Sequence, residues 1–261
     1  MPELPEVERA ARALSRAALG KTIASVRAIH PALKRKLPPA RSRAVKGKRI
    51  DRIERRGKHQ LLHLDNGSTL VVHFRMNGDW EIGTTDKDLD RFARAVIDLT
   101  DGTRISLVDR RALSSITLDK KGASSLPKLG REASDPSLDA DYLAEVLARR
   151  KVAIKPALMD QSVIAGLGNI YAAEALWEAE LDPRTPSPSL TKEKLENLVN
   201  AIRLVLSPKK RRPGRYTDTR GTSRFAVYDR EGKICRRCGG TIERIVQAGR
   251  STYFCPDCQL P

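Results

Sequence analysis

The sequence contains no long hydrophobic run and no apparent internal repeat. Among its 261 residues, no stretch approaches the roughly 18 consecutive apolar residues that a transmembrane helix needs. No apolar stretch follows a basic start, as it does in a secretory signal. We therefore expect neither an integral membrane protein nor a secreted one.

Acidic residues are few compared with basic ones. Lys and Arg number 49 and Asp and Glu 32, which gives a formal net charge of +17 and a sequence pI near 10.1. Hydrophobic residues make up 40% of the 29.0 kDa chain, enough for one large folded domain or two smaller ones. A positive excess on a folded chain favours a polyanionic partner, most commonly nucleic acid. A ribosome-associated or simply basic soluble protein is the alternative on charge alone.

Cysteine is absent from the first 234 residues. All four cysteines lie in the last 27, as Cys235-x-x-Cys238 and Cys255-x-x-Cys258 with sixteen residues between the pairs. Two such pairs place four thiolates around one tetrahedral Zn²⁺, as in closed structural sites. Residues 241–246 and 251–254 are typical of two short strands, so we expect a zinc-bound β-hairpin. Two disulfides or a redox pair are the alternatives.

The chain changes from a β-rich part to a helical part. Residues 5–19 have the apolar spacing of a helix, and Gly20 follows as a stop. Between residues 22 and 118, turn signals separate alternating runs that predict a β-sandwich, with strands at residues 50–54, 60–64, 69–74, 95–100 and 104–108. After a linker at residues 122–136, helical patterns cover residues 140–149, 154–161, 170–178 and 191–206. We therefore expect an α+β fold with a β-sandwich domain (residues 1–122), a helical domain (123–212) and a zinc-hairpin domain (213–261), with the basic breaker at 207–213 before the hairpin.

One segment of the helical part has a composition suited to binding phosphate. Residues 158–171 are predicted to form a helix, an apolar turn with Gly166 and Gly168, and the start of a second helix at Asn169. Glycines allow close backbone approach, and amides at a helix N-terminus together with an Asn side chain bind phosphate well. A tight helical hairpin with an ordinary N-cap is the alternative.

Three motifs together resemble one enzyme family. The first eight residues, Met-Pro-Glu-Leu-Pro-Glu-Val-Glu, the segment at residues 166–171 and the terminal cysteine hairpin resemble the Fpg/Nei family of DNA glycosylases, and the start resembles its Fpg (MutM) branch. The resemblance implies an N-terminal β-sandwich catalytic domain, a helix–two-turns–helix module and a zinc finger. It also implies excision of oxidised bases with strand cleavage, by a cytoplasmic monomer that acts on duplex DNA containing damaged bases or abasic sites.

The N-terminus suits that chemistry. Removal of Met1 would leave Pro2 with a free secondary amine, and an α-amino group with a pKa of about 7.7–8.0 is partly neutral in the cell and therefore nucleophilic. Attack on the sugar C1′ would expel the base and leave an iminium that undergoes β-elimination readily. Glu3 can protonate the opening sugar or move protons. Glu3 and Glu6 could instead only complement the helix dipole; with the resemblance, we expect Glu3 to be catalytic and Glu6 to help orient the site.

Further site residues follow from the resemblance. Lys58 matches the family lysine near the scissile phosphate, and Arg250 matches the arginine that grips phosphates and serves δ-elimination. Met76 lies on a loop resembling one that fills the gap left by a flipped nucleotide. Arg110 matches the arginine that pairs with the orphaned base opposite the lesion. The remaining residues expected to contact DNA are His73, Arg94, Lys151, Lys155 and Asn169.

The sequence also departs from the family pattern. Residues 110–113 read Arg-Arg-Ala-Leu, so the wedge aromatic is missing, and Arg94 is expected to replace a histidine absent from residues 92–94. The segment between residues 206 and 235 is short and lacks the loop that closes over 8-oxoguanine. These departures favour formamidopyrimidines, hydantoins or oxidised pyrimidines as substrates. A Nei-like oxidised-pyrimidine glycosylase and a non-catalytic binder of damaged DNA are the alternatives.

Overall fold

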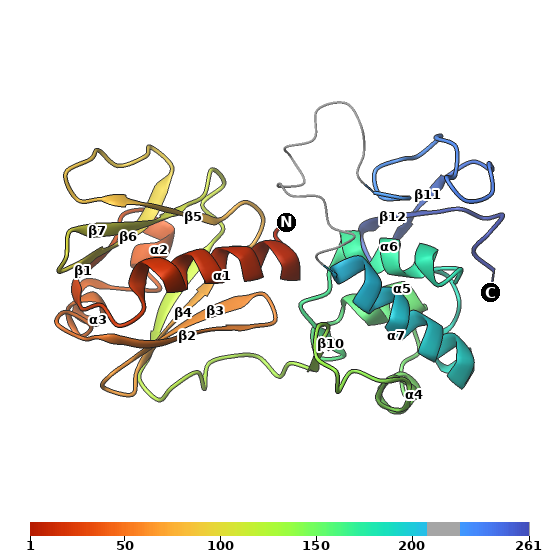
Figure 1. Ribbon diagram of the computed structural model, residues 1–261, viewed down its shortest axis with the longest axis horizontal. Helices are drawn as coiled ribbons and strands as arrows, with labels where there is room; N and C mark the ends of the chain where they lie inside the picture. The colour runs from red at the N-terminus through yellow and green to blue at the C-terminus, as the bar shows by residue number, and fades with distance from the viewer. Residues whose placement is uncertain (208–224, 261) are drawn as a thin grey trace. The chain divides into compact units, whose positions relative to one another are not determined.

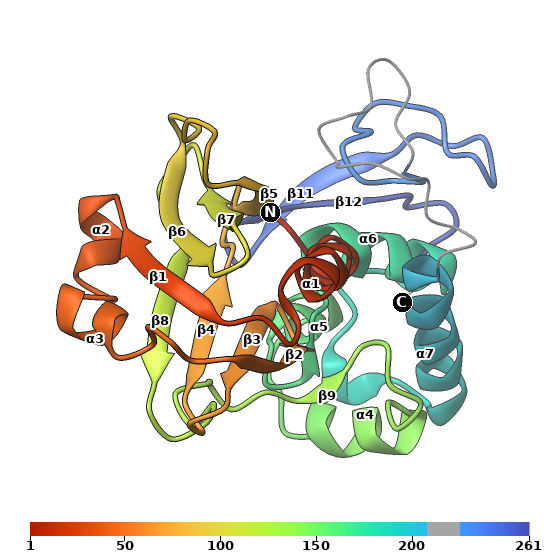
Figure 2. The ribbon, with the colours of Figure 1, turned by 60° about the vertical axis from the view of Figure 1, so that its left-hand side comes forward.

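The computed structural model describes residues 1–207 and 225–260, and the chain divides into two compact units, Met1–Pro127 and Lys128–Pro261. Figures 1 and 2 show helix α1 and the long strands in the first unit, and helices α4 to α7 with the hairpin β11–β12 in the second. Across the described ranges, no helix is both long enough and apolar enough to cross a bilayer.

Helix α1 (Leu4–Ala18) confirms the helix predicted at residues 5–19, shifted by one residue at each end. Its apolar face is buried through Leu4, Val7, Ala10, Ala11, Leu14 and Ala18. The helix is followed by Gly20, whose φ of 78° lies in the left-handed region that favours glycine. Because the apolar face packs on the core of the first unit, the N-terminus of α1 is held in a fixed position on that unit.

Two four-stranded antiparallel sheets form the rest of the first unit. One has the order β1–β6–β7–β5, with β1 Ile23–Ala28, β6 Ala93–Leu99, β7 Thr103–Val108 and β5 Asp79–Thr84. The other has the order β2–β3–β4–β8, with β2 Ile50–Arg56, β3 His59–Leu64, β4 Thr69–His73 and β8 Ser115–Asp119. Five strands match predicted runs, whereas β1, β5 and β8 were expected only as part of a β-rich region.

One hydrophobic core joins both sheets and α1. It contains Leu14 from the helix, Ile97 and Ile105 from the first sheet, and Leu62 and Leu70 from the second, all at most 1% exposed. Two short helices, α2 (Pro31–Lys34) and α3 (Pro39–Arg43), follow β1. Core residues recur at every second position along strands of both sheets, for example at Ala95, Ile97 and Leu99, as expected for a sandwich.

Helices dominate the second unit. They are α4 (Ala140–Leu147), α5 (Ile154–Met159), α6 (Asn169–Glu178) and α7 (Lys192–Leu206), with a 3₁₀ turn, η1, at Ser187–Ser189. All four correspond to predicted helices, and α6 begins at Asn169 as expected.

The expected linker at residues 122–136 is only partly a linker. Its last part contains β9 (Arg131–Glu132), which pairs in parallel with β10 (Ile164–Ala165). A Cβ added to Gly130 would lie 2.2 Å from the carbonyl oxygen of Val163, so only glycine permits this approach. The segment is largely polar, so its sequence contains no signal of this strand pairing.

The hairpin predicted between the cysteine pairs is present as β11 (Glu243–Gln247) and β12 (Arg250–Phe254). Its two turn residues, Ala248 and Gly249, both have positive φ, 47° and 69°, which matches the twist of a tight hairpin. Except for Ser207, the expected basic breaker at 207–213 lies outside the described residues, as does much of the short segment after residue 206.

Candidate functional site

Glu3 and Glu6 cap the start of α1. Glu3 is the N-cap residue, and Oε2 of Glu6 accepts a hydrogen bond of 3.0 Å from the backbone N–H of Glu3, while the Glu3 side chain accepts from the backbone of Glu6. Glu3 is only 1% exposed, although it carries a carboxyl group. Pro2 next to it is half-buried. The first turn thus holds a buried carboxyl group beside Pro2, at the positive end of the helix dipole.

Lys58 lies in the turn between β2 and β3. The preceding Gly57 has a φ of 57°, and Lys58 is only 6% exposed. Arg55 organises this turn, because its Nη1 donates to the carbonyl oxygen of Gly57 at 3.1 Å and its Nε donates to Oε2 of Glu8 at 2.7 Å. Burial is the largest single effect and opposes ionisation of Glu8, but the hydrogen bonds and positive charges of Arg55 and Arg12 together lower the pKa of Glu8. Arg55 and Glu8 thus support the turn that carries Lys58, and the sequence did not indicate this pairing.

His73 is held in its neutral form. Its ring stands edge-on to that of His59, with 4.6 Å between ring centroids, and its Nδ1 accepts from the backbone N–H of Arg75 at 2.9 Å. Burial, followed by the positive fields of His59, Arg75, Lys58 and Lys36, lowers the pKa of His73 to about 3. At neutral pH the Nδ1 atom is therefore an acceptor, which leaves the proton on Nε2.

Met76 sits on a tightly closed loop after β4. The backbone N–H of Gly78 donates to the carbonyl oxygen of Phe74 at 3.0 Å, and Arg75 adopts a φ of 54°. A Cβ on Gly78 would lie 2.8 Å from that same carbonyl oxygen, so the closure requires glycine. Phe74 packs edge-on against Trp80, and this contact anchors the base of the loop. Met76 is half-buried on this loop.

Arg94 and Arg110 gather around one aromatic ring. Their guanidinium carbons lie 5.7 and 5.2 Å from the ring centroid of Phe92, and that of Arg91 lies at 4.6 Å. Nε of Arg94 also donates to the carbonyl oxygen of Asp109 at 2.6 Å. The structure thus joins Arg94 to the loop that carries Arg110, a contact the sequence does not indicate.

Asp109 fixes the loop at residues 110–114. Its carboxylate is 1% exposed and accepts from the backbone N–H groups of Arg111, Leu113 and Ser114 at 2.9, 2.8 and 2.7 Å. Arg110 is exposed at the start of this loop, and Leu113 is 43% exposed further along it. The loop therefore presents a cation and an apolar side chain on a rigid backbone.

Gln161 holds the two turns between α5 and α6 together. Its Nε2 donates to the carbonyl oxygens of Met159 and Leu167 at 3.0 and 2.7 Å, and its Oε1 accepts from the backbone N–H of Gly166 at 3.0 Å. Gly166 has a φ of 95°, which accounts for the glycine at this turn. The two turns place Asn169, which is half-buried, at the first residue of α6.

The sequence-predicted cations of the second unit lie in different environments. Lys151 and Arg250 are exposed, and Arg250 begins β12 directly after the hairpin turn. Lys155 is 0% exposed, and its Nζ lies 2.6 Å from Oδ1 of Asn169 and 2.8 Å from Oγ1 of Thr252. The structure thus brings Lys155 and Asn169 together in the interior, next to the strand that Arg250 begins.

Glu174 attaches the residues before the cysteine knuckles to α6. It is buried, and its carboxylate accepts from the backbone N–H groups of Ala226, Val227 and Tyr228 at 2.7, 2.9 and 3.0 Å. Burial raises the pKa of Glu174 against the effect of these donors. No signal in the sequence distinguishes this residue from other helix-surface glutamates.

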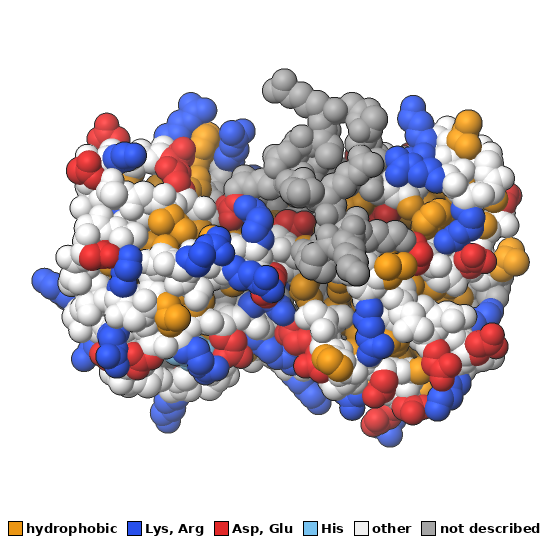
Figure 3. Space-filling view, viewed as in Figure 1, with side chains coloured by type: hydrophobic (Ala, Val, Ile, Leu, Met, Phe, Trp, Pro, Cys, Tyr) orange, Lys and Arg blue, Asp and Glu red, His pale blue; other side chains and the backbone are white. Residues whose placement is uncertain are grey.

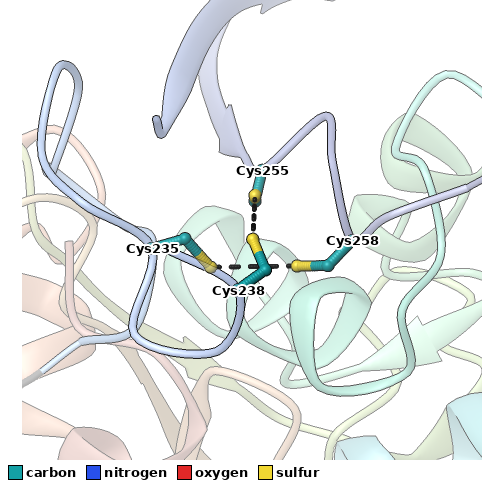
Figure 4. A group of neighbouring side chains, drawn as sticks. All are labelled: Cys235, Cys238, Cys255 and Cys258. Atoms are coloured by element: carbon teal, nitrogen blue, oxygen red, sulfur yellow. Dashed lines mark hydrogen bonds between the residues drawn. The ribbon is translucent and has the colours of Figure 1, made fainter. Parts of the chain in front are cut away.

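The four cysteines converge on one point, as Figure 4 shows. Their sulfur atoms lie within 4.8 Å of one another, with 3.8 Å between Cys235 and Cys258 and 3.4 Å between Cys238 and Cys255. Zn–S bonds of about 2.3 Å in a tetrahedron separate sulfur atoms by about 3.8 Å. The donor set and its geometry therefore fit one zinc ion, and these four residues are positioned to bind it.

Hydrogen-bond donors around the sulfur atoms support this assignment. Nε1 of Trp177 and the backbone N–H of Gly240 lie 3.4 Å from the sulfur atoms of Cys235 and Cys238. Although burial opposes it, hydrogen bonds from backbone N–H groups and from Trp177 lower the pKa of Cys235 to about 6. Such donors stabilise the thiolate form that binds zinc.

Charged side chains cover much of the surface. Figure 3 shows Lys and Arg side chains over the visible faces of both units, with Asp and Glu among them. Many of the cations are paired; Arg104, for example, donates to Asp98 at 2.7 Å. The net charge of +17 thus coexists with local ion pairs.

Family comparisons agree with this arrangement. Residues 1–116 match the formamidopyrimidine-DNA glycosylase N-terminal domain, residues 129–213 the formamidopyrimidine-DNA glycosylase H2TH domain, and residues 232–260 the zinc finger found in FPG and IleRS. Formamidopyrimidine-DNA glycosylases of Chloroflexus aurantiacus and Chloroflexus aggregans are 41% and 42% identical, over 100% of this chain and 98% and 99% of theirs.

Solved structures give the same result. MutM in complex with DNA containing carbocyclic 8-oxo-G superposes with a TM-score of 0.88, at 29% identity over 100% of both chains. Lactococcus lactis Fpg in complex with Fapy-dG-containing DNA superposes with a TM-score of 0.87, at 29% identity over 99% of this chain and 100% of that one. The resemblance inferred from the three motifs and the predicted fold class are confirmed, and the chain belongs to the formamidopyrimidine-DNA glycosylase family.

Proposed function

We propose that this protein is a bifunctional DNA glycosylase and abasic-site lyase of base excision repair. The observation that carries the proposal is the buried carboxyl group of Glu3, 1% exposed, beside Pro2 at the start of α1. Hydrogen bonds of the capping box offset the cost of burying this acid, and a carboxyl group held beside an N-terminal proline has the proton-transfer capacity that base removal requires. Family membership supports the same reading.

The chemistry starts at Pro2 after Met1 has been removed. The neutral Pro2 nitrogen attacks C1′ of the damaged nucleotide, the bond between C1′ and the base breaks, and the base leaves with a proton. Glu3 donates a proton to the deoxyribose oxygen as the ring opens, giving an iminium between Pro2 and C1′. The iminium acidifies C2′, so loss of a C2′ proton expels the 3′ phosphate. A second elimination expels the 5′ phosphate.

Lys58 and Glu6 assist in different ways. Glu6 holds the backbone N–H of Glu3 at 3.0 Å and thereby fixes the geometry of the first turn. Lys58 carries a positive charge in the β2–β3 turn, where we propose that it contacts the scissile phosphate and serves proton transfer during elimination. His73, Met76, Arg94 and Arg110 are proposed to contact the remaining DNA around the flipped nucleotide.

The second unit is proposed to bind the DNA backbone. Asn169 at the start of α6, together with Lys151 and Arg250, offers phosphate-binding groups, and Arg250 is proposed to act in δ-elimination. A zinc ion on the four cysteines would supply no reaction step, since all four positions of its tetrahedron are taken by sulfur. Its part is to hold the β11–β12 hairpin in shape.

The substrate is proposed to be duplex DNA with an oxidised base or an abasic site. Related structures contain DNA with carbocyclic 8-oxo-G and with Fapy-dG, which supports oxidised purines as a class. Residues 110–113 lack the aromatic wedge, so we favour formamidopyrimidines, with 8-oxoguanine or hydantoins as further lesions. We propose action as a monomer in the cytoplasm, and a division into residues 1–122, 123–212 and 213–261.

Borohydride trapping tests the proposal. The duplexes carry 8-oxoguanine, a formamidopyrimidine, a hydantoin, thymine glycol or an abasic site, and we expect a covalent adduct that Pro2→Gly abolishes. Pro136→Gly, at an exposed proline, is the matched control and keeps trapping. Adducts mainly with thymine glycol would favour the Nei-like alternative. Intact binding without any adduct would favour a non-catalytic binder of damaged DNA.

A further inference from the structure

Lys155 is a lysine in the protein interior whose ammonium group is met by neutral acceptors. Its side chain is 0% exposed, and Nζ donates to Oδ1 of Asn169 at 2.6 Å, to Oγ1 of Thr252 at 2.8 Å and to the carbonyl oxygen of Ser251 at 3.4 Å. A buried charge is costly unless its hydrogen bonds are made. The contacts connect α5, the start of α6 and β12, all within the second unit.

These contacts dictate which way the Asn169 amide faces. Oδ1 accepts from the ammonium of Lys155, and Nδ2 donates to the carbonyl oxygen of Ser251 at 3.0 Å. If the amide were flipped, its NH₂ group would face the ammonium and its oxygen would face the carbonyl oxygen, so both contacts would become repulsive. Lys155 and Ser251 together therefore select one of the two amide orientations.

The selected orientation leaves Asn169 as a hydrogen-bond donor. An amide nitrogen carries two hydrogens, and within the described residues Nδ2 makes one hydrogen bond, to Ser251. Asn169 is half-buried at the first residue of α6, so its second hydrogen remains for an anion at the helix N-terminus. An oxygen presented at this place would repel a phosphate.

We propose that Lys155 is a positioning residue that sets the Asn169 amide for phosphate, rather than a residue that touches DNA itself. The inference rests on the proposed function, because it takes the DNA backbone as the anion. Thr252, 0% exposed, completes the arrangement by accepting from Lys155. The second unit thus prepares its phosphate donor before DNA arrives.

A double-mutant cycle tests this role. The probe is a duplex with a tetrahydrofuran abasic analogue, and the quantity measured is its Kd. We expect Lys155→Met and Asn169→Ala each to raise Kd by about 10- to 100-fold, the value of one charge-assisted hydrogen bond. In the Asn169→Ala background, Lys155→Met should change Kd by less than about threefold, because the group it positions is gone.

Lys151→Met is the matched comparison, since Lys151 is exposed near the start of α5. Its effect on Kd should be the same with and without Asn169. Additive effects of Lys155→Met and Asn169→Ala, together with a salt dependence of log Kd that falls by about 0.9 in Lys155→Met, would show a direct phosphate contact and overturn the inference.

A second variant covers a folding defect. Zinc content and melting temperature are measured for each variant, and if Lys155→Met does not fold, Thr252→Val replaces it in the same cycle. Thr252 is too buried to touch DNA, so additivity there also overturns the inference. Failure of the wild-type protein to bind any duplex would remove the proposed function as well, whereas tight binding with additive effects removes only the role of Lys155.

Discussion

The Nε atom of Arg55 donates a 2.7 Å hydrogen bond to Oε2 of Glu8, which joins strand β2 to helix α1. The same guanidinium group donates to the carbonyl oxygen of Gly57 in the turn that carries Lys58. One arginine therefore links the first turns of α1, which follow Pro2 and Glu3, to the turn that carries Lys58, the lysine proposed to assist elimination. The Arg55 side chain is 10% exposed, so water cannot replace these bonds easily.

Arg55→Ala tests this link. We expect it to lower the free energy of unfolding by about 1–3 kcal/mol, because it leaves the half-buried Glu8 carboxylate without its main donor. Strand cleavage should fall more than base release, since Lys58 is displaced while Pro2 remains. Urea denaturation and separate assays of the two steps measure this. Arg52→Ala, which removes a surface pair with Glu54, is the control, with a loss below about 1 kcal/mol.

His73 predicts a pH dependence of stability. Burial and neighbouring cations lower its pKa to about 3 in the folded protein, whereas the unfolded chain has an ordinary histidine pKa near 6.5. Below about pH 6.5 the unfolded chain therefore binds a proton that the folded protein does not, and stability falls by up to about 1.4 kcal/mol per pH unit down to about pH 3.

His73→Asn should reduce this acid sensitivity. The Asn oxygen can still accept from the backbone N–H of Arg75, as Nδ1 does now at 2.9 Å. Between pH 7 and pH 5, we expect the variant to lose about 1–2 kcal/mol less than wild type. Urea unfolding at several pH values gives the comparison. Parallel curves for the two proteins would mean that His73 does not titrate as described.

Gly240 lies where the two cysteine knuckles leave no space for a side chain. A Cβ at this position would lie 1.7 Å from Oδ2 of Asp257, and the N–H of Gly240 faces the sulfur atom of Cys238. Gly240→Ala therefore forces the exposed Asp257 side chain to turn away from the new methyl group, and where the knuckle backbone shifts with it the N–H of Gly240 leaves the sulfur atom of Cys238. We expect about a tenfold loss of zinc affinity, the loss typical of disturbed outer ligand contacts.

Competition with a chelator, followed by measurement of DNA affinity, tests that expectation. DNA affinity should fall together with zinc affinity, because the hairpin carries Arg250. Gly83→Ala is the control, since a Cβ there meets no atom within 4 Å. Unchanged zinc retention in Gly240→Ala would contradict the packing argument.

The zinc hairpin and α1 could be predicted because their signals are local. Two closely spaced cysteine pairs with short strands between them specify a hairpin, and the apolar spacing over residues 5–19 specifies a helix. Strand β5 lacks such a signal: Asp79–Thr84 has no buried residue and depends on pairing with β7. Its existence is decided by residues that lie far away in the sequence.

Lys155 shows the same limit at the candidate site. The family resemblance placed Lys155 among the residues expected to contact DNA, and the sequence does not reveal that Thr252 and Ser251 fold over it. Arg55 and Glu8 were missed since 47 positions separate them. Residues that belong to a sequence motif could be assigned a role in advance, but the residues that they contact depend on tertiary packing.

Asp109 holds the loop that carries Arg110, so its substitution tests the proposed contact of Arg110 with DNA. Its carboxylate accepts from three backbone N–H groups of the loop that begins with Arg110. In Asp109→Asn, the amide NH₂ group would face at least one of these donors, so we expect a loss of about 1–3 kcal/mol in the free energy of unfolding and a displaced Arg110.

If Arg110 pairs with the orphaned base, discrimination among opposite bases should fall as far in Asp109→Asn as in Arg110→Ala. Excision rates on duplexes that differ only in the opposite base measure this, with the exposed Asp86→Asn as control. Lost stability with unchanged discrimination would confine Asp109 to folding and separate Arg110 from base reading.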